Sequence, residues 1–179
     1  MSSFCFSKKR ANSMHEEIRT RDLRIRPFRE EDAESFGRNV LGDASLASFF
    51  DGESAADYIH ARMVHADRPH FYDCVIALAE NDTPIGEINA AFIPKDTADV
   101  GYVIASAFRN RGYASQALSA WIAFLTEEGI HTVYGAARED NPASIAVMKH
   151  AGMKPYREVP ECVKKRENEE GLLYFSRKG

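Results

Sequence analysis

The segment Arg109-Asn110-Arg111-Gly112-Tyr113-Ala114-Ser115 constrains the fold of this chain more than any other part of it. It joins an apolar alternating stretch, residues 100–105, to a helical pattern over residues 114–128, so we predict a strand-to-helix turn. The first turn of a helix has unpaired backbone N–H groups and the positive end of the helix dipole, and both favour an anion. The small residues Gly112 and Ala114 would let a bulky anion approach these amides, and the two arginines add positive charge. The loop therefore predicts a pyrophosphate site.

The alternative for this loop is an ordinary turn, with a glycine for the bend and arginines in solvent. Two other nucleotide-binding loops are excluded, because the chain has neither GxxxxGK[ST] nor a GxGxxG after a strand. The pattern that remains is Arg-x-x-Gly-x-Ala at the start of a helix.

Composition indicates one folded domain. The chain has 179 residues and is 44% apolar, which is enough for a substantial core. Residues 1–20 are polar and without sustained periodicity, so we predict a mobile N-terminal tail followed by a single domain over residues 21–179. Cys5, Cys74 and Cys162 are far apart and form no CxxC pattern, which predicts a reduced protein without a metal site. With no apolar run of about 20 residues and no signal-peptide core, we expect a cytoplasmic protein without a membrane partner.

Charge is distributed unevenly along the chain. Residues 27–106 carry five Lys and Arg against fifteen Asp and Glu, whereas residues 107–179 carry eleven against nine. An acidic first half and a more basic second half suit a cationic partner on one side and an anionic cofactor on the other, with plain solubility as the alternative. Such an acidic surface argues against nucleic acid as a partner.

Periodicity and turn signals predict the order of the elements. We expect strands at residues 23–28, 71–80, 84–88, 98–104, 131–136, 154–159 and 172–176, and helices at 30–40, 53–66, 114–128 and 142–151. The second to fourth strands should form an antiparallel meander, and the fifth, reached through a helix, should lie parallel to the fourth. Asn141 is predicted to cap the last helix, with Pro142 at its first position. His60, His65 and His70 are expected at the surface or in packing positions rather than as ligands.

The strand Gly101-Tyr102-Val103-Ile104, the loop from Arg109 to Ala114, and the later Asn141-x-x-Ser144 and Lys149-His150-Ala151-Gly152-Met153 resemble the GNAT superfamily of N-acetyltransferases. The opening residues Leu23 to Ala33 and the Asn-x-x-Ser helix resemble its ribosomal-protein N-terminal (RimJ/RimL-like) branch. The resemblance covers residue 21 to the end. It implies an α/β (α+β) GNAT fold: a mixed, mostly antiparallel sheet of six or seven strands, splayed between the fourth and fifth, with about four flanking helices.

The resemblance also implies acetyl-CoA as the cofactor. Its pyrophosphate would lie on the amides of Arg111 to Ala114, within a binding loop that extends from Arg109 to Ser115. Its pantetheine arm would pair with the backbone of Val103, Ile104 and Ala105. Asn141 would hold a pantetheine amide or an ordered water, although capping the helix is by itself sufficient reason for an Asn there.

Direct attack of an amine on a thioester requires a base, an oxyanion donor and a proton for the leaving thiolate. The backbone N–H near Val103 is the candidate oxyanion donor. Glu87 and Asp99 are the candidate bases, with substrate orientation or a rim position as the alternative for each, and a buried water could relay to either. Many superfamily members carry a Tyr as general acid where this chain has Met148, so Ser144 is the remaining candidate donor, acting on sulfur directly or through water. Asn110 stands where a second loop glycine is common, and asparagine tolerates the left-handed backbone.

Two functions remain open at this point. The first is an acetyl-CoA-dependent N-acetyltransferase that acts on a primary amine, with a cationic acceptor such as a protein or peptide N-terminus, a polyamine or an amino-sugar antibiotic. The second is a non-catalytic CoA-binding or interaction module. The acceptor would contact the two early helices, residues 41–52 and a charged hairpin at 161–171. The sequence does not distinguish a monomer from a homodimer.

Overall fold

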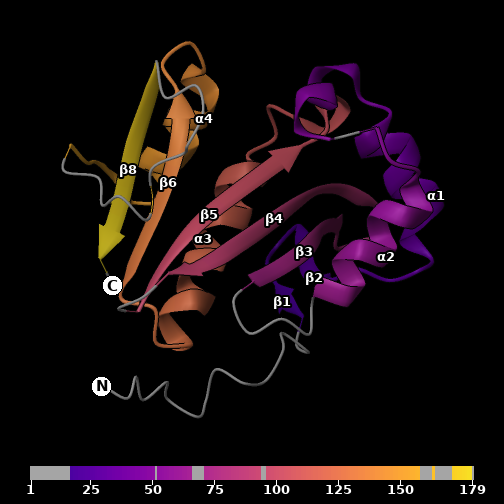
Figure 1. The fold of residues 1–179 in the computed structure, drawn as a ribbon, viewed down its shortest axis with the longest axis horizontal. Helices are drawn as coiled ribbons and strands as arrows, with labels where there is room; N and C mark the ends of the chain where they lie inside the picture. The colour runs from indigo at the N-terminus through magenta and orange to yellow at the C-terminus, as the bar shows by residue number, and fades with distance from the viewer. Residues whose placement is uncertain are drawn as a thin grey trace, which may run out of the picture.

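The computed structural model describes residues 17–50, 52–65, 71–93, 96–157, 163 and 171–178. These residues form one eight-stranded sheet in the order β1-β2-β3-β4-β5-β6-β8-β7 (Figure 1). The strands are β1 (Ile18–Arg19), β2 (Leu23–Pro27), β3 (Phe71–Leu78), β4 (Pro84–Ile93), β5 (Thr97–Ile104), β6 (Thr132–Arg138), β7 (Lys154–Pro155) and β8 (Leu172–Lys178). Among the described strands, β5 and β6 pair in parallel and the other pairs are antiparallel.

The helices are α1 (Asp32–Phe36), which continues into a π-helical turn η2 (Gly37–Leu41), then a 3₁₀ segment η3 (Ala44–Phe49) and α2 (Ala55–His65). A short turn η4 (Ser106–Phe108) precedes α3 (Tyr113–Glu127), and α4 (Pro142–His150) follows β6. The predicted mixed, mostly antiparallel sheet is confirmed, with eight strands rather than six or seven. Neither η3 nor β1 was predicted, and β1 lies in the last residues of the stretch assigned to the tail. Residues 1–16 and most of the predicted charged hairpin at 161–171 lie outside the described residues.

The sheet opens between β5 and β6, which are the fourth and fifth of the predicted strands, so the predicted opening is confirmed. The two strands pair at Thr97–Thr132, Ala98–Val133 and Asp99–Tyr134, and no further register follows among the described residues. Beyond these pairs the two arrows diverge in Figure 1, with β4 and β5 on one side and β6 and β8 on the other. The C-terminal half of β5 therefore presents an open edge.

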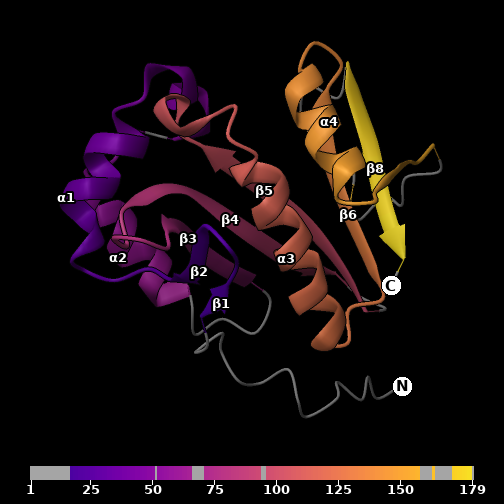
Figure 2. The ribbon, with the colours of Figure 1, turned by 180° about the vertical axis from the view of Figure 1, so that it is seen from behind.

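Helices cover both faces of the sheet. Seen from behind, α3 and α4 lie in front of the strands, whereas α1 and α2 lie on the opposite face (Figures 1 and 2). The apolar stripe of α3 is buried as its periodicity predicted, through Ala117, Leu118, Trp121, Ile122 and Leu125. Trp121 is fully buried, and its indole N–H donates to the Asn89 carbonyl at 3.2 Å, so both its apolar area and its polar group are satisfied. This contact fixes α3 against β4.

The face under α1 and α2 contains a buried ion pair. Arg26, which alternates along β2 with the core residues Leu23 and Ile25, is itself only 2% exposed. Its guanidinium donates to both carboxylate oxygens of Asp32, at 2.9 and 2.8 Å, and its Nε donates to Asp82 at 2.9 Å. A buried charge needs such complete pairing, so this cluster anchors the start of α1 to β2 and to the β3–β4 turn.

Both long helices of the second half end at a glycine in the left-handed conformation. Gly129 (φ 86°) follows α3, and Gly152 (φ 79°) follows α4. After α3, the N–H of Ile130 donates to the Leu125 carbonyl at 2.9 Å and that of Gly129 to Thr126 at 3.0 Å, and the equivalent pair of bonds closes α4. These are Schellman motifs, and they turn the chain from each helix back toward the sheet.

Candidate active site

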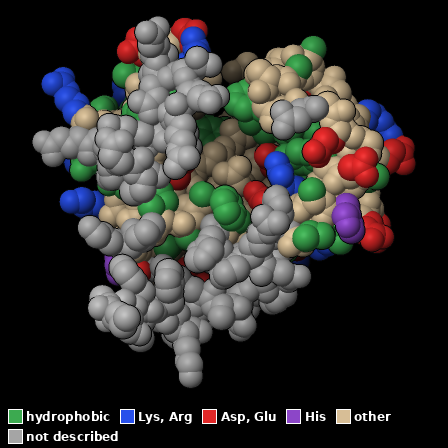
Figure 3. Space-filling view, in the orientation of Figure 1, with side chains coloured by type: hydrophobic (Ala, Val, Ile, Leu, Met, Phe, Trp, Pro, Cys, Tyr) green, Lys and Arg blue, Asp and Glu red, His purple; other side chains and the backbone are tan. Residues whose placement is uncertain are grey.

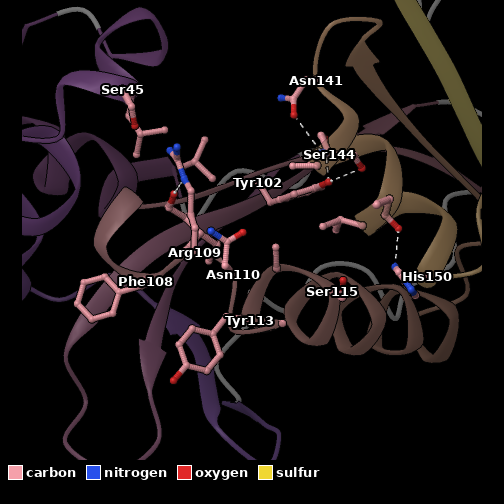
Figure 4. Close-up of a pocket in the computed structure, with 18 of the residues that line it drawn as sticks. Ser45, Tyr102, Phe108, Arg109, Asn110, Tyr113, Ser115, Asn141, Ser144 and His150 are labelled. Atoms are coloured by element: carbon pink, nitrogen blue, oxygen red, sulfur yellow. Dashed lines mark hydrogen bonds between the residues drawn. The ribbon is translucent and has the colours of Figure 1, made fainter.

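A cavity of about 460 Å³ lies at the opening between β5 and β6. Its walls come from the outer half of β5, the loop and first turn of α3, the first and last turns of α4, and η3 (Figure 4). Lining residues that the sequence analysis had selected are Val103, Ile104, Arg109, Asn110, Gly112, Tyr113, Ala114, Ser115, Asn141 and Ser144. Residues up to 41 positions apart are thus brought to one site by the crossover from β5 through α3 and β6 to α4.

The loop before α3 has the backbone conformation of an anion site. Asn110 (φ 62°) and Gly112 (φ 78°) are both left-handed, as predicted for Asn110. Gly112 is the N-cap of α3, no side chain caps the helix, and the N–H of Gln116 makes a hydrogen bond to the Gly112 carbonyl at 3.0 Å. The preceding amides of the first turn have no intrahelical acceptor. A Cβ at Gly112 would meet no atom within 4 Å, so the space before these amides is open to a phosphate.

The two arginines of this loop have different surroundings. Arg109 Nε donates to the Ile104 carbonyl at 2.8 Å, which ties the loop to the end of β5 while the residue still lines the cavity. Arg111 is exposed and is not among the residues that line the cavity. Arg109 therefore shapes the loop in addition to carrying charge.

Asn141 and Ser144 occupy the start of α4. The Asn141 side chain accepts from the Ser144 N–H at 3.0 Å, so the predicted N-cap is confirmed. This bond holds Ser144 in the first turn, at the positive end of the helix, with its hydroxyl beside the cavity (Figure 4). Met148, one turn further, is 2% exposed in the main core, and its methyl group would be 3.3 Å from a Cβ at Gly135. Its side chain is a packing element of the core.

Tyr102 on β5 points to Ser144. The Tyr102 hydroxyl lies 2.9 Å from Ser144 Oγ and 3.3 Å from the Ser144 carbonyl oxygen. Burial raises the pKa of Tyr102 above its ordinary value, although the hydrogen bond to Ser144 opposes this. No role was predicted for Tyr102, which was noted only as part of a motif, because nothing local indicates a contact between β5 and a helix that follows α3 and β6.

Glu87 lies on β4 opposite Val103 and is 9% exposed. Its carboxylate accepts from the Tyr58 hydroxyl at 2.6 Å, and Arg62 in turn donates to that hydroxyl at 2.7 Å. Burial raises the pKa of Glu87, while Tyr58 and Arg62 favour the carboxylate. The side chain points toward α2 and is not among the residues that line the cavity.

Two other predicted residues also lie outside the cavity wall. Asp99 pairs with Tyr134 in the last β5–β6 pair before the two strands separate. Ala105 is 1% exposed, and its N–H donates to the Ile85 carbonyl at 2.9 Å. Because this N–H is already bonded to the chain, a cofactor arm cannot pair with the Ala105 amide.

Three residues of η3 also line the cavity: Ser45, Leu46 and Phe49. Asp43 caps this segment and accepts from the Ser45 N–H at 2.9 Å, the Ser45 hydroxyl at 2.7 Å and the backbone N–H of Ser106. These donors, Ser106 foremost, hold the pKa of Asp43 well below its usual range. The Asp-x-Ser pattern is a recognisable cap, but its contact with Ser106 links segments 63 positions apart.

Comparison with known proteins shows the family to which this chain belongs. A family model described as an acetyltransferase (GNAT) domain matches residues 22–154. The chain belongs to the GNAT acetyltransferase family. GNAT acetyltransferases use acetyl-CoA, and the left-handed loop, open helix N-terminus and free edge of β5 fit its pyrophosphate and pantetheine arm.

Individual relatives are more distant. An uncharacterized N-acetyltransferase, YnaD of Bacillus subtilis (strain 168), is 28% identical over 92 residues, 50% of this chain and 54% of that protein, so the chain spans about half the relative's length. The structure of a putative ribosomal-protein-serine acetyltransferase from Vibrio cholerae superposes with a TM-score of 0.80 at 20% identity, over 94% of this chain and all of that one. Mycobacterium smegmatis RimJ in complex with CoA-disulfide gives 0.72 at 18% identity, over 88% and 82%. The RimJ-like fold is thereby shared.

Two further features of the described residues bear on other classes of site. No group of three or more His, Cys, Asp or Glu among them is placed to hold a metal ion. Within the same part of the chain, no helix has both the length and the apolar character to cross a membrane.

Proposed function

We propose that this protein transfers an acetyl group from acetyl-CoA to a primary amine. The observation that carries the proposal is the convergence of three features on one cavity: the anion loop before α3, the open edge of β5 and the Ser144 hydroxyl. The loop would bind the pyrophosphate, and the pantetheine arm would lie along β5 at Val103 and Ile104. A backbone N–H near Val103 would stabilise the oxyanion as the amine attacks.

Ser144 is the proposed proton donor to the departing sulfur. Its N–H is fixed by Asn141, it lines the cavity, and the alternative position one turn later is an inward-facing methionine. The N-terminal end of α4 also favours negative charge on a nearby thiolate.

Glu87 is a better candidate base than Asp99. Glu87 lies opposite Val103 in the β4–β5 register. Asp99 is four residues earlier on β5, where β5 is still paired with β6. A carboxylate with a raised pKa is a stronger base than an ordinary one, which suits removal of a proton from an ammonium. Because Glu87 lies behind the cavity wall, a water molecule would relay the proton to it.

A cationic acceptor is supported by the surface over α1 and the start of α2. Acidic side chains gather at that edge of the molecule in Figure 3, where exposed acidic residues are Glu30, Glu31, Glu34, Glu53 and Asp57. Arg29 and Arg38 offset part of this charge. The proposal therefore favours amines with further positive charge, such as basic peptide N-termini and polyamines.

The test is release of CoA from acetyl-CoA, followed with a thiol reagent, in the presence of short peptides with free N-termini, polyamines, free amino acids and aminoglycosides. We expect turnover with one class of amine, no turnover with N-acetylated forms of the same amines, and strong loss in Gly112→Trp. Tight acetyl-CoA binding without acetylation of any amine would instead indicate a CoA-binding module.

A further inference from the structure

Tyr102 and Ser144 form a hydroxyl pair in the wall of the cavity, and the chain has no acid at the usual tyrosine position of α4. We propose that Tyr102, from β5 rather than from α4, is the positioning residue that orients the Ser144 hydroxyl and restores its proton. This inference rests on the proposed function and deepens it, because it completes the path by which the leaving sulfur is protonated.

Either hydroxyl of the pair could donate to the other, and the proposed role requires that Tyr102 be the donor. A phenol has one proton to donate, and its two possible acceptors are Ser144 Oγ at 2.9 Å and the Ser144 carbonyl oxygen at 3.3 Å. Hydroxyl–hydroxyl bonds are optimal near 2.7–2.8 Å, so the bond to Oγ is the better one. When Tyr102 donates to Oγ, the Ser144 proton is free to point to another acceptor in the cavity. The carbonyl bond alone would hold α4 to the sheet without leaving the serine oriented.

Burial keeps Tyr102 in the form that this role requires. The partly buried ring lies on β5 beyond the last β5–β6 pair, and burial raises the pKa of its hydroxyl. The phenol therefore remains protonated at neutral pH and donates steadily to Ser144. Asn141 fixes the other side of the serine through its N–H, so the residue is held from two directions.

The proton balance is complete without another reactant. The amine nitrogen forms a bond to the carbonyl carbon and loses one proton to the base or to solvent. As the carbon–sulfur bond breaks, its electron pair goes to sulfur, which accepts the Ser144 proton. Ser144 Oγ takes the Tyr102 proton, and the phenolate recovers one from water. The products are the N-acetyl amine and CoA thiol.

A double-mutant cycle tests the relay. The variants are Tyr102→Phe, Ser144→Ala and both together, with Tyr72→Phe as the control, since Tyr72 is 6% exposed in the core and does not line the cavity. We expect Tyr102→Phe to lower kcat about 10- to 100-fold, at or below the low end of what acid–base catalysis contributes, and to leave KM and Kd for acetyl-CoA within about twofold. In the Ser144→Ala background the same change should cost less than about threefold. The proposal would be overturned if the kcat losses of the two single variants multiplied in the double variant, or if Tyr102→Phe affected KM alone.

A second readout does not depend on turnover. CoA carrying ¹³C beside its sulfur reports the pKa of the bound thiol through its chemical shift across a pH series. Hydrogen bonding to Ser144 should hold this pKa lower in the wild-type complex than in Ser144→Ala, and Tyr102→Phe should shift it in the same direction as Ser144→Ala, whereas Tyr72→Phe should not. An unchanged thiol pKa in Tyr102→Phe would refute the orientation of Ser144 by Tyr102. Failure of the proposed function would appear separately, as absence of CoA release in the wild type.

Discussion

The anion loop makes a quantitative prediction at Gly112. Gly112 and Gly129 stand at the two ends of α3, both are left-handed (φ 78° and 86°), and at both an added Cβ meets nothing within 4 Å. Replacing either by Ala forces a side chain into the left-handed region, which costs about 1–2 kcal/mol. For a chain of this length that corresponds to a fall in Tm of about 2–8 °C. The two variants should therefore lose similar stability.

Their effects on CoA binding should differ. The Gly112 methyl would stand in the cavity before the first-turn amides, whereas Gly129 is at the opposite end of the helix. Loss of one charge-assisted hydrogen bond to a phosphate costs about 1.5–3 kcal/mol, which is about 10- to 150-fold in Kd. Calorimetric titration of CoA into each variant gives the answer. If Gly112→Ala binds CoA within twofold of Gly129→Ala, the phosphate does not lie on these amides.

Three further predictions concern the supporting structure. Asp32→Asn should cost about 3–5 kcal/mol in urea unfolding, because it removes the carboxylate that pairs with both terminal nitrogens of the buried Arg26 guanidinium and leaves Asp82 on its Nε alone. Asp140→Asn, which breaks the exposed pair with Arg138, should change the stability little, and equal losses would contradict the account of the cluster. If Glu87 is the base it must be ionised, so kcat/KM should fall on the acid side through a pKa above that of an ordinary carboxyl. Tyr58→Phe, by removing the donor that lowers this pKa, should move that limb to still higher pH, and a limb that stays in place would argue against Glu87. Asp43→Ala should accelerate amide exchange across η3 and at Ser106 while the second half of α3 stays protected, and unchanged exchange in η3 would show that Asp43 does not hold it.

Local patterns were sufficient to predict much of this fold. The three- and four-residue spacing in α3, the Asn141–Pro142 start of α4 and the glycines after both helices each specify an element through its own backbone needs. The helical crossover between these two strands then predicted the parallel β5–β6 pair. Within the site, the loop that should bind phosphate was predicted for the same reason, since its chemistry depends on consecutive residues.

Contacts between distant segments could not be predicted in this way. Tyr102 meets Ser144 across 42 positions, and Asp43 meets Ser106 across 63, through the packing of elements whose relative placement the periodicity leaves open. The burial of Arg26 has the same origin: an alternating strand predicts one buried face, but here α1 and α2 cover the second face as well. Glu87 and Asp99 were both close to the reacting strand in sequence, and only the register and the side-chain contacts separate them.

The most direct test of the central claim is the mass of the acceptor after incubation with ¹³C-acetyl-CoA, together with the position of the label. We expect a single ¹³C-acetyl group on the amine nitrogen of one class of acceptor with the wild-type protein. Gly112→Trp should give little or none. Absence of labelled amine across peptides, polyamines, amino acids and aminoglycosides, in a protein that still binds CoA through the loop before α3, would contradict the assignment of acetyl transfer to this cavity.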